Sequence, residues 1–225
     1  VRHTLDRFRK GDTGTLNEQL AKSLWFHIQT TYPAVFELPA AFADGADSDD
    51  MLFALLKRFF ALKPPKISDF AKGFAGRYVC YTLSSLKYPN AYVTVSEMEL
   101  TQTKAGALRM TETQEYLTKG KLLREVYSGF CLPKGTSKIM LTHDEQHNSR
   151  PRLYYITDDI DTEIDGTLTK AFFKGFVIAY SKNFGGAFQC NFFCRRLDRG
   201  ESVTKDIIAR SELDDEDVDQ WIFPG

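Results

Sequence analysis

The chain has 225 residues, and its 29 basic and 30 acidic side chains give a formal net charge of −1. This balance excludes a protein that binds nucleic acid through bulk charge alone, and it also excludes a strongly acidic disordered chain. Hydrophobic residues make up 43% of the chain and aromatic residues 13%, which is enough to build a sizeable core. No apolar run reaches the roughly 18 residues that cross a bilayer, so we expect no membrane partner.

Residues 1–65 carry the sequence signals of helices. Thr15 and Glu18 form a capping box, and leucines follow it at helical spacing. Residues 51–62 are apolar almost all round, which predicts a deeply packed helix that ends at Pro64. We expect this region to supply connecting and dimerisation helices, although packing against the rest of the chain would explain their apolar character equally well.

The pattern changes after residue 74, where short runs of aromatic and β-branched residues alternate with turn signals. Eight strands are predicted, over residues 76–84, 91–101, 106–113, 120–131, 137–142, 152–157, 167–181 and 187–197. Because no helical segment separates them, an antiparallel barrel or barrel-like sandwich over residues 74–198 is favoured. The fold class is therefore α+β, with N-terminal helices packed on an eight-stranded antiparallel body. Residues 199–225 are expected to form an acidic C-terminal tail.

The four cysteines are too sparse for a disulfide framework, and each lies in an apolar or aromatic run. We expect them to be reduced and buried, as in a cytoplasmic protein. Searches for catalytic motifs find no nucleophile elbow, phosphate-binding loop or dinucleotide fingerprint. The sequence therefore assigns no catalytic residue and no cofactor.

Two segments have the residue types of metal sites without the required spacing. His143 and His147 flank two carboxylates, but a zincin helix needs Glu directly after the first His. Residues 158–166 hold five acids, but a calcium loop that starts at Asp161 would have Phe172 at its last ligand position, where Glu is required. We interpret both segments as solvated loops and expect no metal.

Polar residues on the predicted strands are candidates for recognising a ligand inside the barrel, since binding sites set a few polar groups among aromatic ones. The candidate ligand-binding residues are Tyr81, Tyr127, Tyr155, Gln189 and Asn191. The tyrosines fit equally well in the core or at an interface, with a backbone partner for the hydroxyl group.

The first and last predicted strands share a further pattern. The first begins with Gly76 and has an aromatic residue at Tyr78, while the last ends with Arg195 and Arg196. This arrangement resembles the lipocalin-like (calycin) barrels, in which a cation packs over an aromatic ring at the closed end. The resemblance implies that Gly76, Tyr78 and Arg195 or Arg196 close the barrel. The alternative is an ordinary β-domain with a basic edge.

The first eleven residues resemble the DNA-reading helix of bacterial helix-turn-helix regulators. The residues that carry this resemblance are Arg2, His3, Thr4, Leu5, Arg7, Phe8 and Gly11. It implies that the apolar positions face a small core, and that phosphates or base edges are contacted by Arg2, His3, Arg7 and Arg9. A plain amphipathic helix is the alternative interpretation.

Together these patterns predict the ligand-sensing domain of a bacterial transcriptional regulator. Its partners would be an unidentified small molecule, a second copy of the chain in a homodimer, and DNA through the N-terminal segment. Two other classes remain open: an interaction module of a defence or signalling assembly, and a small enzyme that works inside the barrel.

Overall fold

The computed structural model describes residues 53–54, 56–58, 61–84, 91–104, 106–118, 120–134, 137–145, 151–181 and 186–224. The helices predicted before residue 51, together with Arg2, His3, Arg7 and Arg9, lie outside these residues. Of the apolar helix predicted over 51–62, the described residues 53–54 and 56–58 are helical. No helix formed by the described residues is both long enough and apolar enough to span a membrane.

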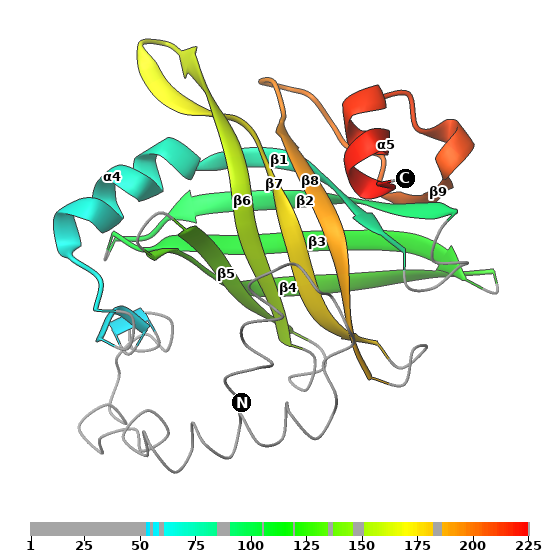
Figure 1. Cartoon of the computed structure of the whole chain (residues 1–225), viewed down its shortest axis with the longest axis horizontal. Coiled ribbons are helices and arrows are strands. Elements are labelled where there is room, and N and C mark those ends of the chain that lie inside the picture. Colours follow the sequence, from blue (N-terminus) through cyan, green and yellow to red (C-terminus); the bar gives the residue numbers. More distant parts are fainter. Residues whose placement is uncertain are drawn as a thin grey trace.

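Eight antiparallel strands close into a barrel, as the sequence predicted (Figure 1). The strands are β1 (Gly76–Leu83), β2 (Tyr92–Gln102), β3 (Leu108–Thr118), β4 (Lys121–Lys134), β5 (Ser137–Asp144), β6 (Pro151–Ile164), β7 (Thr167–Ser181) and β8 (Gly186–Arg196). Each strand pairs with the next along the chain, and β1 pairs with both β2 and β8, which closes the sheet. Strands β1 to β8 therefore follow one another around the barrel in chain order.

The strand β6 is longer than predicted. It continues to Ile164, so the acidic residues expected in a loop lie within a hairpin with β7. Lysines on β7 compensate them, because Lys170 contacts Asp159 and Asp161, and Lys174 lies 3.7 Å from Asp158. Opposite charges on neighbouring strands allow an acidic run to remain extended.

The helix α4 (Pro64–Phe74) starts where the sequence predicted that a helix ends. Proline is accommodated in the first turn of a helix, where its missing N–H group has no partner to lose. This helix lies across one end of the barrel (Figure 1), and its Ala71 and Phe74 side chains are fully buried against the barrel interior. We call this end the α4 end.

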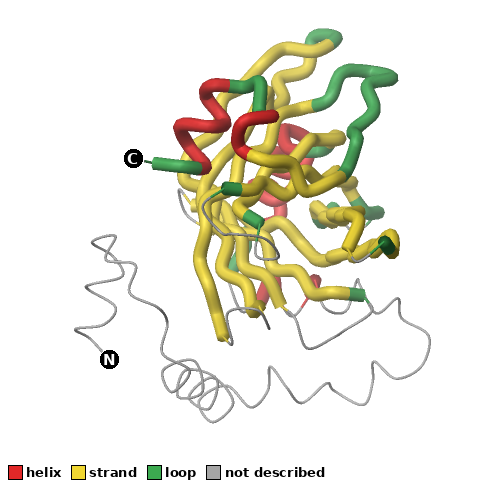
Figure 2. The backbone as a smooth tube through the Cα atoms, turned by 90° about the vertical axis from the view of Figure 1, so that its right-hand side faces the viewer, coloured by secondary structure: helices red, strands yellow, loops and turns green. Residues whose placement is uncertain are grey.

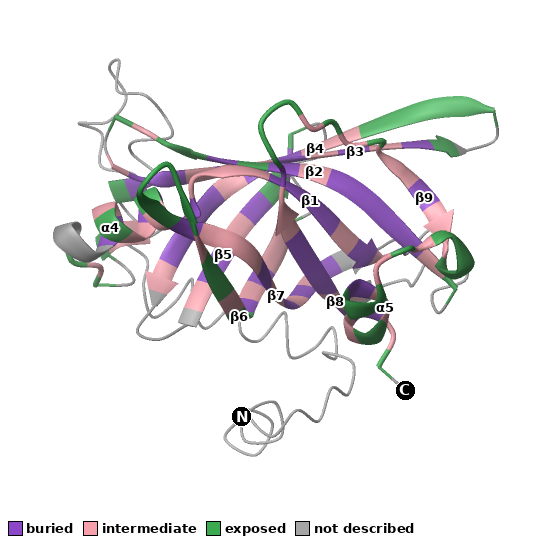
Figure 3. Cartoon of the chain, turned by 90° about the horizontal axis from the view of Figure 1, so that it is seen from above, coloured by how far each residue is buried: buried purple, intermediate pink, exposed green. Residues whose placement is uncertain are grey.

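Buried residues alternate with less buried ones along much of the barrel strands (Figure 3). The inward row of each strand contributes to one continuous hydrophobic core. Its largest fully buried side chains include Tyr78, Met98, Leu100, Leu108, Met110, Met140, Tyr154, Phe173 and Phe192. A second apolar cluster lies on the outer face of β4 and β5, where Phe130, Leu132 and Ile139 pack against Phe53 and Ile67. The chain before the barrel therefore covers part of its outer surface.

The acidic C-terminal segment packs on the barrel (Figure 2). It forms β9 (Asp206–Ala209), which extends the sheet beside β2, then a short 3₁₀ turn (Arg210–Glu212) and α5 (Glu216–Ile222). The Trp221 indole donates a hydrogen bond of 2.9 Å to the Phe192 carbonyl oxygen, and the Asn191 amide donates one of 2.8 Å to the Trp221 carbonyl oxygen. The aromatic end of the chain is thus fastened to β8.

Candidate functional site

An arginine closes the α4 end of the barrel. The Arg196 guanidinium lies 5.5 Å from the centre of the Tyr78 ring and donates hydrogen bonds of 2.9 Å to the Tyr78 hydroxyl and the Ala75 carbonyl oxygen. A third hydrogen bond goes to the Thr169 hydroxyl. At Gly76 the backbone φ is +153°, and an added Cβ would lie 2.6 Å from the guanidinium. The guanidinium therefore occupies the space that a side chain at position 76 would fill, and the positive φ there also favours glycine.

Arg195 has a different position from Arg196. It points to the outer face, where it pairs with Glu201 at 2.9 Å. Of the two arginines that the calycin resemblance left open, the one that packs over Tyr78 is therefore Arg196. Successive strand residues point to opposite faces, so only one of them can enter the barrel.

A buried carboxylate lies farther along the barrel, away from α4. Glu112 on β3 is fully buried, and both of its oxygens accept hydrogen bonds. Oε1 accepts from the Ser96 hydroxyl and the Gln114 amide, each at 2.7 Å. Oε2 accepts from the Tyr154 hydroxyl and from Arg152 Nη1, the latter at 3.4 Å. Four donors thus saturate this carboxylate, as a buried charge requires.

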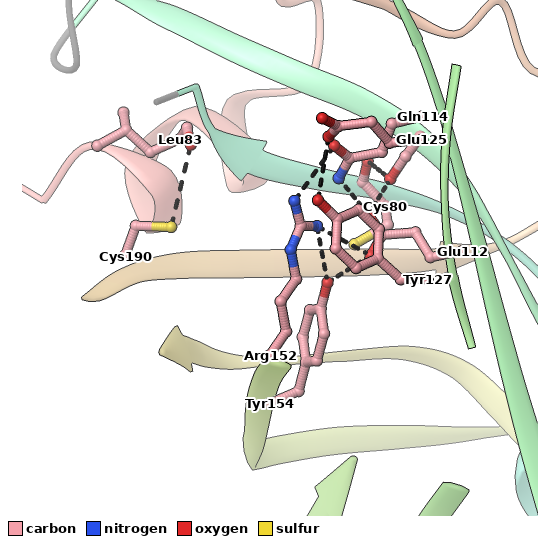
Figure 4. Close-up of polar contacts among 10 residues, drawn as sticks. Cys80, Leu83, Glu112, Gln114, Glu125, Tyr127, Arg152, Tyr154 and Cys190 are labelled. Atoms are coloured by element: carbon pink, nitrogen blue, oxygen red, sulfur yellow. Dashed lines mark hydrogen bonds and ion pairs between the residues drawn. The ribbon is translucent and has the colours of Figure 1, made fainter. Parts of the chain in front are cut away.

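The guanidinium of Arg152 on β6 is held less tightly (Figure 4). Its contacts with Glu112, Tyr154 and Gln114 are all 3.4 Å long, beyond the roughly 2.7–3.2 Å usual for such bonds. Its central carbon lies 3.4 Å from the centre of the Tyr127 ring, and the Tyr127 hydroxyl donates to Glu125 at 3.0 Å. These contacts with described residues use Nη1 and Nη2, whereas a guanidinium carries five N–H donors.

A hydroxyl without a partner lies beside this arginine. Thr142 on β5 is 5% exposed, and its Oγ1 has no hydrogen-bond partner among the residues that the structure describes. Its neighbour on β6 is Arg152, and its neighbour on β4 is Gly129, which offers no side chain. A Cβ at Gly129 would lie 1.8 Å from the Leu141 carbonyl oxygen, so the close approach of β4 and β5 requires glycine there. We call Glu112, Gln114, Tyr127, Thr142, Arg152 and Tyr154 the interior polar cluster.

The electrostatics of the interior polar cluster keep its tyrosines protonated. Burial, reinforced by Glu112, raises the pKa of Tyr154 well above its ordinary value, and burial also raises the pKa of Tyr127. Burial lowers the pKa of Arg152, but Tyr154 and Glu112 outweigh this effect and leave that pKa above its ordinary value. Tyr154 is therefore a donor to Glu112, and Arg152 is always a cation.

The five residues proposed from sequence to bind a ligand inside the barrel are divided by the structure, and four of them lie outside it. Tyr127 belongs to the interior polar cluster. Tyr81 packs with Val79 and Val95 on the outer face, and Tyr155 stacks on Phe176 at 5.1 Å. The remaining pair, Gln189 and Asn191, alternate with the interior Cys190 and Phe192. For these four residues the expected position inside the barrel is wrong. The sequence shows that alternate strand residues face opposite sides, but it does not show which of the two sets faces the interior.

Glu112, Gln114, Thr142, Arg152 and Tyr154 were missed by sequence analysis. A signal for the first two was present, since the apolar row Leu108–Met110 of β3 turns polar at the next inward positions. Arg152 and Tyr154 repeat this spacing at the start of β6. A polar residue at an inward position of a barrel strand indicates either a structural network or a binding site.

The four cysteines are free and buried. Cys80 and Cys194 face each other across β1 and β8, and burial raises the pKa of both thiols. Burial also raises the pKa of Cys190 to about 12. A thiol that stays protonated is a poor nucleophile, so these residues act as small apolar side chains.

A recess of about 460 Å³ lies outside the barrel, between β7, β8 and α5. Its cations already have partners, because Arg195 pairs with Glu201 and Lys174 lies 4.5 Å from the centre of the Trp221 ring. The interior polar cluster, with spare donors and an unpartnered hydroxyl, is the better candidate for a binding site.

Within the part of the chain that the structure describes, no group of three His, Cys, Asp or Glu side chains is placed to hold a metal ion. Comparison with known proteins identifies no relative: no family model, curated protein or solved structure matches the chain. Function must therefore be inferred from the site itself.

Proposed function

We propose that the barrel binds a small organic molecule at the interior polar cluster and that this domain is the ligand-sensing part of a bacterial transcriptional regulator. The observation that carries the binding proposal is the Thr142 hydroxyl, which is buried next to Arg152 and has no partner in the described part of the chain. An unsatisfied buried hydroxyl costs about 1–3 kcal/mol, a cost that a bound ligand with a polar atom removes.

The chemistry of the cluster supports a binding site more than a stabilising network. A buried ion pair is often no more stable than an apolar core of the same volume. The three contacts of Arg152 at 3.4 Å are also too long for a network optimised for stability alone. A few convergent polar groups set among apolar ones are typical of ligand sites.

The regulatory part of the proposal is supported by the sequence of residues 2–11. In this scheme a homodimer carries two DNA-reading segments, and a ligand that favours one dimer arrangement changes their spacing. The size of that change is limited by the difference in ligand affinity between the two arrangements.

Native mass spectrometry of the purified chain tests the binding proposal. We expect a bound small molecule that is released on denaturation, and we expect Arg152→Met and Thr142→Val to lose it. Arg195→Met is the matched control, because it removes an arginine of the outer face and should retain the ligand. Equal occupancy in all four proteins would place the ligand elsewhere.

A gel-shift assay with DNA from upstream of the gene tests the regulatory proposal. We expect binding by the full chain, weakening with added salt, and reduced binding by Arg7→Ala. A chain that binds no DNA at low salt would refute the regulatory role and leave ligand binding unaffected.

A further inference from the structure

The interior polar cluster contains one cation, and its charge is already compensated. Arg152 keeps 16% of its side-chain surface exposed and pairs with Glu112, whose carboxylate is fully buried. Glu112 accepts four hydrogen bonds and is held there by Ser96, Gln114 and Tyr154. The carboxylate therefore cannot move away to free the guanidinium for a second anion.

The other acidic side chains around the cluster make it no more favourable for a bound anion. Glu125 on β4 accepts from the Tyr127 hydroxyl, and Asp144 on β5 is fully buried opposite Tyr127. Both side chains are acidic, so neither supplies a counter-charge for a bound anion. Among the described residues whose side chains contact the cluster, Arg152 has no second cation beside it. A bound carboxylate would therefore be buried without a counter-charge, which is costly.

The groups of the cluster that are left to bind a ligand are hydrogen-bond donors. A guanidinium can only donate, and a hydroxyl can donate as well as accept. A ligand amine would meet Arg152 donor to donor and charge to like charge. A group that satisfies both Arg152 and Thr142 must therefore accept hydrogen bonds.

We propose that the interior polar cluster selects a ligand whose buried polar group is an uncharged acceptor, a carbonyl oxygen, which receives hydrogen bonds from Arg152 and Thr142. This inference rests on the proposed binding function, and it names the chemical class of the ligand. Selectivity against a carboxylate comes from Glu112, which neutralises Arg152 before any ligand arrives.

The barrel contains its own reporters for a test. The chain has four methionines, and Met98, Met110 and Met140 are fully buried inside the barrel. Met98 lies opposite Glu112, and Met140 lies opposite Tyr154 and two residues from Thr142. Their ¹³C-labelled methyl groups report by NMR on any molecule that enters the cluster.

Four probes with the same ring test the head group: acetophenone, ethylbenzene, benzoate and benzylamine. In the wild-type chain at pH 7 we expect acetophenone to shift the Met98 and Met140 methyl signals in a saturable way. Benzoate and benzylamine should bind at least about tenfold more weakly, which corresponds to roughly 1.4 kcal/mol. Ethylbenzene has the shape of acetophenone without the acceptor and should also bind more weakly.

Two variants sharpen the test. Thr142→Val should lower the affinity for acetophenone towards that for ethylbenzene, because only Arg152 then donates to the carbonyl oxygen, while Thr113→Val on the half-buried outer side of β3 should have no effect. Glu112→Gln removes the charge that neutralises Arg152, so the affinity for benzoate should rise about tenfold or more. Thermal melting of each variant confirms that it is folded, and the Thr142→Val result stands even if Glu112→Gln does not fold.

The outcomes separate the two proposals. If benzoate binds the wild-type chain as tightly as acetophenone, or if acetophenone and ethylbenzene bind equally, the carbonyl inference is overturned and the binding function remains. If none of the four probes shifts a methionine methyl at millimolar concentration, both proposals are overturned.

Discussion

Two arginine side chains point into the barrel, Arg196 from β8 and Arg152 from β6, and their hydrogen bonds differ. Arg196 at the α4 end donates two hydrogen bonds of 2.9 Å, one of them to a backbone carbonyl, and fills the space that Gly76 leaves open by having no side chain. Arg152 makes three contacts of 3.4 Å, all with side chains, and lies beside an unpartnered hydroxyl. The first arginine closes the α4 end of the barrel through short hydrogen bonds, whereas the hydrogen bonds of the second are longer. The same residue type is therefore bonded tightly at one end of the barrel and loosely farther along.

The largest effect on stability is expected from removing Glu112, the acidic partner of Arg152. Glu112→Ala leaves a guanidinium in the barrel without its counter-charge, which should lower the free energy of unfolding by about 3–5 kcal/mol in urea titration. The double variant Glu112→Ala with Arg152→Met should recover most of this loss, because no charge then remains buried. A double variant no more stable than the single one would mean that the pair is not coupled.

Removal of the closing arginine should have the next largest effect. Arg196→Met deprives the Ala75 carbonyl and the Tyr78 hydroxyl of their donor, and we expect a loss of about 2–4 kcal/mol in unfolding free energy. The same substitution at Arg195, whose partner Glu201 lies on the outer face, should cost less than about 1 kcal/mol. Equal losses at the two positions would contradict the assignment of Arg196 as the residue that closes the barrel.

A smaller effect on the free energy of unfolding should come from Asp159 at the α4 end, and it should depend on pH. Burial raises the pKa of Asp159, but hydrogen bonds from Lys138 and Lys170 outweigh this and leave the pKa below its ordinary value. The stabilisation is therefore complete above the unfolded-state pKa of about 4 and is lost as the pH falls through the folded-state value. Asp159→Asn should flatten the acid limb of a stability-against-pH curve. An unchanged acid limb would show that the two lysines do not stabilise the fold through Asp159.

The smallest change, and the one with opposite sign, is expected at Thr142. Thr142→Val replaces an unsatisfied buried hydroxyl by a methyl group of similar shape, so the chain should gain roughly 1 kcal/mol and melt about 2–4 °C higher. Thr113→Val, on the outer side of β3, is the control and should leave the melting temperature nearly unchanged. A lower melting temperature for Thr142→Val would indicate that the hydroxyl has a structural partner.

Much of the barrel was predictable because local chemistry marks it. Turn residues separate the runs of aromatic and β-branched residues, and all eight predicted strands are present. Two predicted strands end far too early. The strand β3 continues past residue 113 to Thr118, and β6 continues through its acids because their lysine partners lie on β7, beyond the reach of local patterns. The sequence predicts that Pro64 ends a helix, whereas in the structure it starts one, because proline suits both positions.

The candidate site was much less predictable than the fold. From sequence alone, Gln189 and Asn191 are as polar as Glu112 and Gln114. The apolar row of β3 turns polar at Glu112, but no local pattern shows that this row faces the interior of the barrel. Only closure of the sheet, with β1 between β2 and β8, defines which row is inside. A shift of one residue in register would exchange the two rows, which is why four of the five proposed ligand residues lie on the outer face.

The sequence by itself determined the class of fold, the eight strands and the residues available for closure, because each of these depends on neighbours within a few positions. Only the tertiary structure decided that Arg196 rather than Arg195 closes the barrel, and that Glu112, Thr142 and Arg152 meet inside it. Glu112 and Arg152 are forty residues apart in the chain. Their encounter follows from strand pairing around a closed sheet, which is a property of the whole barrel and of no single segment.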